Sequence, residues 1–156
     1  MELSANLQPL AGIVGTWKGE GRGTYPTITP FQYTEEITFT NIGKPFLHYM
    51  QRTWNAAGLP LHTETGYLRS PGNGVVEMTL ALPTGQTELL EGTLREEDGA
   101  LVLTMSGKVL NTATAKRVEA TERTYRLSGD RLASTMSMAA VGVDMNLHLT
   151  TEFSRV

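Results

Sequence analysis

The chain has 156 residues, no cysteine and a formal net charge of -3 at pH 7. Without cysteine, disulfides, thiolate catalysis, zinc ribbons and iron–sulfur clusters are excluded, so metal chemistry must use histidine or carboxylates or arrive with a cofactor. The slightly acidic charge, with lysines and arginines scattered along the chain, argues against a nucleic-acid-binding surface.

The length fits one domain, and we predict that residues 1–156 form a single unit. No apolar run approaches the ~20 residues of a membrane-spanning helix, and Met1 to Leu3 lack the basic start of a signal peptide. We therefore expect a cytoplasmic protein with no membrane partner.

The segment from Asn6 to Gly15 is the one stretch that could form a short helical turn. It carries apolar side chains up to Gly15 and has no period of two. We interpret it as a lid or plug for the structure that follows.

From Thr16 onward the pattern changes to the period of two that is typical of a strand. Trp17, Gly19, Gly21 and Gly23 fall on one face, opposite charged residues that would point to water. Glycine in a strand packs nothing, so we interpret the inward glycines as room for a group that approaches closely.

Pro26 fixes φ and cannot donate to a strand ladder, so the first strand ends before it and Thr27 lies on a rim loop. The segment Ser70 to Gly74 is the strongest turn signal, and Pro83 to Gly85 predicts a hairpin loop. Eight further strands are expected between such turns: 33–41, 46–54, 61–68, 75–82, 87–94, 101–106, 119–127 and 132–139.

With a last strand from Met145 to Val156, the count is about ten strands at regular spacing. This pattern predicts an all-β fold, an antiparallel up-and-down barrel with a short N-terminal helical turn. A barrel of more than eight strands encloses more space than its own side chains fill, so we expect an inner cavity.

His148 lies in the middle of the last strand and is a candidate ligand for a transition metal or haem iron. Strict alternation places it opposite Leu147, Leu149 and Phe153. Either the barrel interior is polar near its mouth, which we prefer, or a bulge shifts the phase of the strand. The first alternative leaves an apolar stripe outside the barrel and motivates the hypothesis of a homodimer.

Two motifs frame the chain: a GxWxGxG run at 15–21, formed by Gly15, Trp17, Gly19 and Gly21, and an ending, residues 148–155, that begins with His148. Together with intervening segments they resemble the nitrobindin family, small β-barrels similar in shape to fatty-acid-binding proteins. The family ending is HLxAxLxR, and this chain departs from it mildly: Thr151 stands in place of Ala and Phe153 in place of Leu.

The resemblance implies one ferric haem b per chain in a shallow, solvent-open pocket. It implies that His148 is the sole axial ligand of the iron and that Thr27 lies near the haem. It also implies that the protein binds nitric oxide and isomerises peroxynitrite to nitrate.

Other residues receive a structural interpretation. His48 and His62 occupy alternating strand positions and are expected at the surface or the rim, although either could approach the far side of the haem. Met136 and Met138 share a face and are expected to fill the core.

Rival functional classes rest on other residues. Glu35 and Glu36 are adjacent in a strand and point to opposite faces, which excludes them as a glycosidase pair. The remaining rival is a non-enzymatic carrier of a fatty acid or another small apolar ligand, with Arg52, Arg123 or Arg126 binding a carboxylate.

Overall fold

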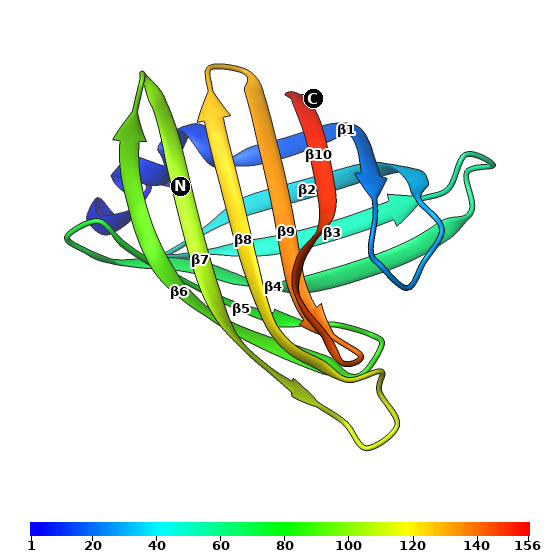
Figure 1. Cartoon of the computed structure of the whole chain (residues 1–156). Coiled ribbons are helices and arrows are strands. Elements are labelled where there is room, and N and C mark those ends of the chain that lie inside the picture. The colour runs from blue at the N-terminus through cyan, green and yellow to red at the C-terminus, as the bar shows by residue number, and fades with distance from the viewer.

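The computed structural model describes all 156 residues as a closed antiparallel barrel of ten strands, preceded by one short 3-10 helix (Figure 1). Each strand pairs with its neighbours in the chain, and β1 pairs with β10 to close the barrel. The predicted all-β up-and-down barrel is therefore confirmed. The elements are η1 (Ala5–Ile13), β1 (Gly15–Gly23), β2 (Phe31–Lys44), β3 (Phe46–Trp54), β4 (Pro60–Gly72), β5 (Val75–Ala81), β6 (Gln86–Glu97), β7 (Ala100–Asn111), β8 (Val118–Ser128), β9 (Arg131–Ala140) and β10 (Val143–Arg155).

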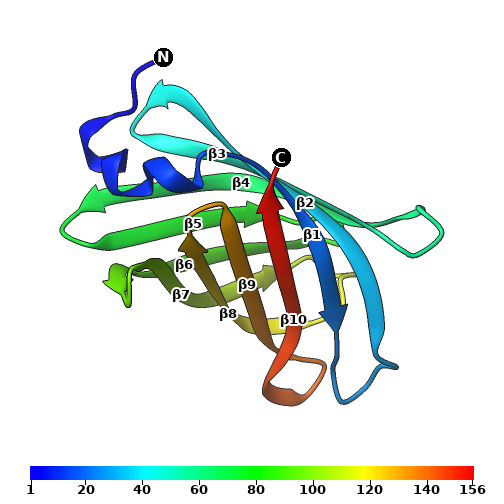
Figure 2. The ribbon, with the colours of Figure 1, turned by 90° about the horizontal axis from the view of Figure 1, so that it is seen from above.

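The two ends of the barrel differ. Helix η1 lies across one end, whereas the β1–β2, β3–β4, β7–β8 and β9–β10 connections surround the other end (Figures 1 and 2). We call the second end the mouth. The helix has nine residues, and no helix combines the length and hydropathy that a bilayer crossing requires.

Strand β2 shows why the sequence forms a barrel wall. Tyr33, Glu35, Ile37 and Phe39 are all buried, and the residues between them are more exposed. This alternation matches the predicted faces, and it places a carboxylate among the apolar side chains of the interior. The wall is therefore apolar towards one end and polar in its middle.

The β4–β5 connection confirms the strongest turn signal. Gly72 pairs with Val75 across a two-residue turn, in which Asn73 and Gly74 have φ of 56° and 70°. Two successive positive φ values are the requirement of a type I′ hairpin, which Asn-Gly meets at low cost. The turn thereby sets the pairing of β4 with β5.

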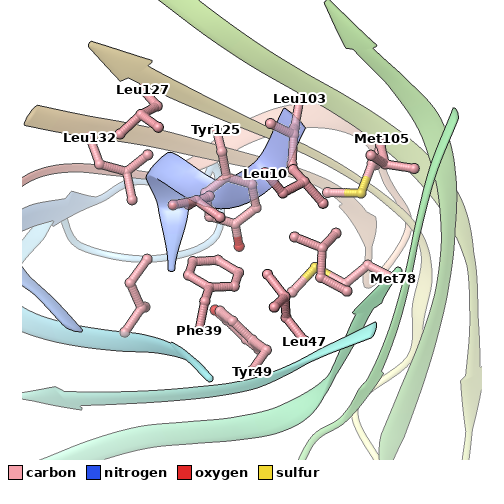
Figure 3. Packing of buried hydrophobic residues seen from close by; sticks show 14 of the residues in the cluster. Leu10, Phe39, Leu47, Tyr49, Met78, Leu103, Met105, Tyr125, Leu127 and Leu132 are labelled. Atoms are coloured by element: carbon pink, nitrogen blue, oxygen red, sulfur yellow. The ribbon is translucent and has the colours of Figure 1, made fainter. Parts of the chain in front are cut away.

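Helix η1 closes its end of the barrel as the predicted plug. Leu7, Leu10 and Ile13 are fully buried in the hydrophobic core. Figure 3 shows Leu10 above side chains from the strands, among them Phe39 and Tyr49, whose ring centroids are 5.2 Å apart. Burying three aliphatic side chains contributes roughly 1.5–3 kcal/mol each, which holds the helix on the barrel.

The inward glycines of β1 leave room for a group that approaches closely, and at Gly21 and Gly23 that group is an aromatic ring of β2. A Cβ at Gly21 would lie 2.3 Å from the Tyr33 ring, and one at Gly23 would lie 2.2 Å from the Phe31 ring. Each glycine therefore allows an aromatic ring of β2 to lie flat against the wall. Trp17 belongs to the core at the plugged end, where its Nε1 donates to the Ile13 carbonyl at 2.9 Å.

Candidate functional site

A cavity of about 700 Å³ lies inside the mouth half of the barrel. Its wall combines aromatic and aliphatic side chains with two histidines, and its inner part is polar. The lining includes Phe31, Tyr33, His62, Met136, Met138, His148 and Leu149 in the wall, and Glu35, Gln51, Glu64, Glu88, Thr121, Arg123 and Thr151 towards the floor. The predicted inner cavity is therefore present, and it is large enough for a drug-sized ligand.

His148 enters this cavity because β10 bulges at that residue. Leu147 pairs with Ser137 of β9 and Leu149 pairs with Met136, so His148 is the extra residue of the strand. Both His148 and Leu149 consequently line the cavity. A bulge of this kind changes the direction of a side chain without breaking the sheet.

The bulge corrects the preferred interpretation of the last strand. Thr151 and Phe153 are buried, whereas Glu152 and Ser154 are exposed. The polar face of β10 therefore lies outside the barrel. Of the two alternatives, the structure has the bulge that shifts the phase of the strand. The external apolar stripe is correspondingly shorter than expected, because Leu149 and Phe153 face inward.

The ring of His148 is oriented by the loop between β1 and β2. Its Nδ1 donates a hydrogen bond to the Thr24 carbonyl at 2.9 Å, which leaves Nε2 without a partner in the chain. The Thr24 amide in turn donates to the His148 carbonyl at 2.8 Å. A histidine that ligates a metal commonly donates its other ring N–H to such a carbonyl, which sets the tautomer.

Aromatic rings enclose the imidazole on two sides. The centroid of Tyr25 lies 5.6 Å from that of His148, and Phe31 lies at 6.5 Å, both edge-on. Tyr25 is itself fixed, because its hydroxyl accepts from the Ala140 amide at 3.1 Å and donates to the Met138 carbonyl at 3.1 Å. The loop that positions His148 is thus tied to β9.

Burial lowers the pKa of His148 below its ordinary value of 6.5. The hydrogen bond to Thr24 opposes this shift, and positive charge on His62 adds to it. The ring is consequently neutral at physiological pH. A neutral imidazole with one unoccupied nitrogen is the form that binds a metal.

The structure does not bring every candidate residue to this cavity. Thr27 is exposed on the β1–β2 loop and is not part of the cavity wall, although Tyr25, two residues earlier, contacts His148. Trp17 and the glycines of the GxWxGxG run, Gly15, Gly19 and Gly21, also lie outside the cavity lining. Their part in cofactor binding stays a prediction.

A buried ion network, formed by Glu64, Arg123 and Glu88, lies at the floor of the cavity. Arg123 donates to Glu64 at 2.6 and 3.1 Å and to Glu88 at 2.6 and 3.1 Å. Burial alone would raise the pKa of Glu64, but the charge of Arg123 and a hydrogen bond from His62 lower it to about 2. Glu64 is therefore ionised throughout the physiological range.

A second polar group lies beside that network. Glu35 accepts from the Thr151 hydroxyl at 2.6 Å and from the Gln51 amide at 3.2 Å. Burial is the largest cause of a raised pKa at Glu35. The Oε1 of Gln51 has no hydrogen-bond partner, so this corner of the floor has one unused acceptor.

The two other histidines occupy different environments. His62 lines the cavity, and its Nε2 lies 3.4 Å from Glu64 Oε2. His48 bonds the Thr65 hydroxyl at 2.9 Å and is not part of the cavity wall. The rim or surface interpretation fits both residues, but only His62 shares a cavity with His148.

Met136 and Met138 also differ from expectation. They line the cavity and do not belong to the buried core cluster, so their interpretation as core residues is wrong. Flexible thioether side chains suit a wall that must adapt to a flat ligand. Their shared strand face was visible in the sequence, whereas the position of that face beside His148 depends on the pairing of β9 with β10.

Sequence and structure comparisons agree on one group of proteins. The chain matches the THAP4-like, heme-binding beta-barrel domain over residues 6–155. It is 46% identical to peroxynitrite isomerase 2 of Mycobacterium ulcerans, across 99% of this chain and 97% of the relative. It is 44% identical to peroxynitrite isomerase 1 of Mycobacterium tuberculosis, with the same coverage.

A solved structure is similar over nearly the whole chain. The crystal structure of Rv2717c from M. tuberculosis superposes with a TM-score of 0.96 at 44% identity, and the match covers 99% of both chains. The barrel, the plug and the mouth thus belong to a shared architecture.

Proposed function

The chain belongs to the THAP4-like, haem-binding β-barrel family, also called nitrobindins, and from that premise we propose that it is a haem-dependent peroxynitrite isomerase. In this proposal one ferric haem b binds per chain, His148 is the axial ligand of the iron, and peroxynitrite is converted to nitrate. Nitric oxide is a second ligand of the same site. The observation that carries the proposal is the His148 ring, neutral, fixed through Nδ1 and free at Nε2 inside the cavity.

The residues of the cavity fit a haem. The volume of about 700 Å³ would accommodate a flat cofactor of this size. Phe31, Leu149, Met136 and Met138 give the wall the apolar surface that a porphyrin requires. His148 supplies a nitrogen ligand of the kind found in many haem proteins.

When bound, ferric haem supplies a Lewis-acidic iron with an open coordination position, which suits an anionic oxidant that rearranges on the metal. The chain contributes the remaining functions. Thr24 holds the tautomer of His148, Tyr25 and Phe31 pack edge-on against its ring, and the cavity wall would surround the bound group.

Hemin titration of the purified chain tests the proposal. We expect a Soret band that saturates at one haem per chain and is lost in His148→Ala. His48→Ala, a histidine outside the cavity, should saturate as the parent does. The haem-loaded parent should speed the decay of peroxynitrite and raise the share of nitrate among the products. Failure of the parent to bind haem would contradict the proposal.

The arginines argue against the rival carrier. Arg52 and Arg126 are paired with Glu36 and Glu97 on the outside of the barrel. Arg123 faces the cavity, but four of its five N–H groups are taken by Glu64 and Glu88. At the floor of the cavity a fatty-acid carboxylate would find no free cation and would meet buried carboxylates instead, because the other cation of the lining, Lys116, is exposed.

Assembly, location and domain organisation remain predictions. Met145 and Leu147 are 37% and 48% exposed, which supports the homodimer hypothesis with a smaller apolar surface than the sequence implied. Analytical ultracentrifugation at high concentration tests it, and a monomer would contradict it. The cytoplasmic location and a single domain over residues 1–156 rest on the sequence pattern.

A further inference from the structure

We propose that His62 contacts the ligand bound at the open position of the haem iron and accepts the proton that a weakly acidic ligand loses as it binds. The inference rests on the proposed haem site. It adds a second histidine, with a role of its own, to the same cavity.

The topology places the two histidines on opposite walls. In the closed barrel β4 is four strands from β10 in one direction and six in the other. His62 is the third residue of β4, at the mouth end, and both histidines line one cavity. Charge on His62 also affects the pKa of His148, so the two rings lie within electrostatic range. A flat cofactor that His148 held would therefore share the cavity with His62.

The buried ion network positions the His62 ring. Nε2 of His62 lies 3.4 Å from Oε2 of Glu64, a carboxylate that can only accept, so Nε2 carries the ring proton. Glu64 cannot turn away, because Arg123 and the Tyr49 hydroxyl also bind it. When the His62 ring carries a single proton, that proton lies on Nε2 and Nδ1 has a free lone pair.

Among the titratable groups of the cavity, only His62 and His148 have a ring nitrogen without a partner in the chain. Glu64 and Glu88 are occupied by Arg123, and Glu35 accepts from Gln51 and Thr151. Lys116 is a cation, and the hydroxyl of Tyr33 is bonded to Thr151. With His148 assigned to the iron, no second base competes with His62.

A ligand that binds as its anion releases a proton, and His62 is placed to accept it. A weak acid such as hydrogen cyanide binds ferric iron as its anion, so one proton leaves for each bond formed between carbon and iron. Nδ1 of His62 accepts that proton and becomes imidazolium beside the Glu64 carboxylate. Peroxynitrous acid, the protonated form of the proposed substrate, would lose its proton in the same way. A positioned base typically accelerates such a transfer by about 10²–10⁴-fold.

The test is the rate of cyanide association with the haem-loaded ferric protein near pH 7. We expect His62→Leu to slow association at least about tenfold and His62→Gln to slow it similarly, because neither can accept a proton. His48→Leu and His48→Gln, the same changes outside the cavity, should stay within about twofold of the parent. Carbon monoxide binding to the ferrous protein releases no proton and should change much less.

The outcomes separate this inference from the proposed function. If the parent took up no haem, the proposed function itself would fail. Normal haem uptake with cyanide rates within twofold in both His62 variants would overturn the role of His62. Haem loss in the His62 variants, with retention in His148→Ala, would make His62 the axial ligand and also overturn it.

Discussion

Arg123 is a buried cation that holds two buried carboxylates together. It is 7% exposed and holds two carboxylates, Glu64 and Glu88, that are more buried still. Each ion of such a group is desolvated, and only the mutual attraction and the hydrogen bonds offset that cost. Removal of the cation would leave uncompensated charge in the interior.

We therefore expect Arg123→Met to lower the free energy of unfolding by about 3–5 kcal/mol. Arg126→Met is the matched control, because Arg126 is paired with Glu97 at the surface and its loss should cost about 1 kcal/mol or less. Urea denaturation of the three proteins measures both changes. Equal stability of the two variants would show that the buried network is not held by Arg123.

Glu35 gives a pH-dependent prediction. Burial raises its pKa above the ordinary value of 4.5, so the folded chain keeps this proton to higher pH than the unfolded chain does. The free energy of unfolding consequently falls as the pH rises from 4.5 through the raised pKa. Glu35→Gln should not lose this free energy of unfolding as the pH rises, because its amide imitates the protonated acid. The amide can also donate a hydrogen bond to the unused Gln51 Oε1.

The stability difference, Glu35→Gln minus parent, should thus increase between pH 4 and pH 7. Chemical denaturation at several pH values measures it, and Glu36→Gln serves as the control on the outer face. A difference that stays constant across this range would mean that folding does not raise the pKa of Glu35.

At the residue scale, the sequence predicted that His148 is the central group but not how it is held. Its partner Thr24 is 124 positions away in the chain, and no local pattern reports such a contact. Inward-facing Glu64 and Arg123 could be read from alternation, but their pairing depends on distances across the barrel.

The β10 bulge is the element on which the site depends. It adds one residue at His148 and thereby lets two consecutive side chains, His148 and Leu149, face the cavity. A regular strand would turn one of them outward. The position of the site is therefore a property of the strand as a whole and of its register with β9.

Deleting Leu147 should remove the extra residue and restore a regular strand. Because Leu149, Thr151 and Phe153 anchor the inward phase, we expect His148 to turn outward and haem binding to be lost while the barrel stays folded. The Soret band and far-ultraviolet circular dichroism measure the two properties. Leu147→Ser keeps the chain length and should keep the haem; parent-like haem binding by the deletion would contradict the role of the bulge.

The elements themselves were largely predictable. The predicted strand 46–54 coincides with β3, and Asn73-Gly74 makes the expected turn. The bulge was only one of two alternatives, because apolar and polar residues alternate on both sides of His148. Because carboxylates also lie in the interior, apolar character alone does not predict which residues face inward. The sequence therefore could not decide which side chains of β10 face the cavity.

At the scale of the whole molecule, stability and chemistry occupy opposite ends of the barrel. The plugged end holds the hydrophobic core with η1 (Figures 2 and 3). The mouth holds the cavity with His148. The ion network forms the layer between them. Such a division allows the cavity wall to serve a cofactor while the packed end maintains the fold.

The central claim is that His148 is the axial ligand of a haem, and rescue of His148→Gly by free imidazole tests it most directly. The glycine variant removes the ligand and leaves space for imidazole beside the Thr24 carbonyl. We predict weak haem binding without imidazole and a parent-like Soret band and haem stoichiometry when imidazole is added. Haem binding by His148→Gly that matches the parent without imidazole, or that imidazole does not restore, would contradict the account.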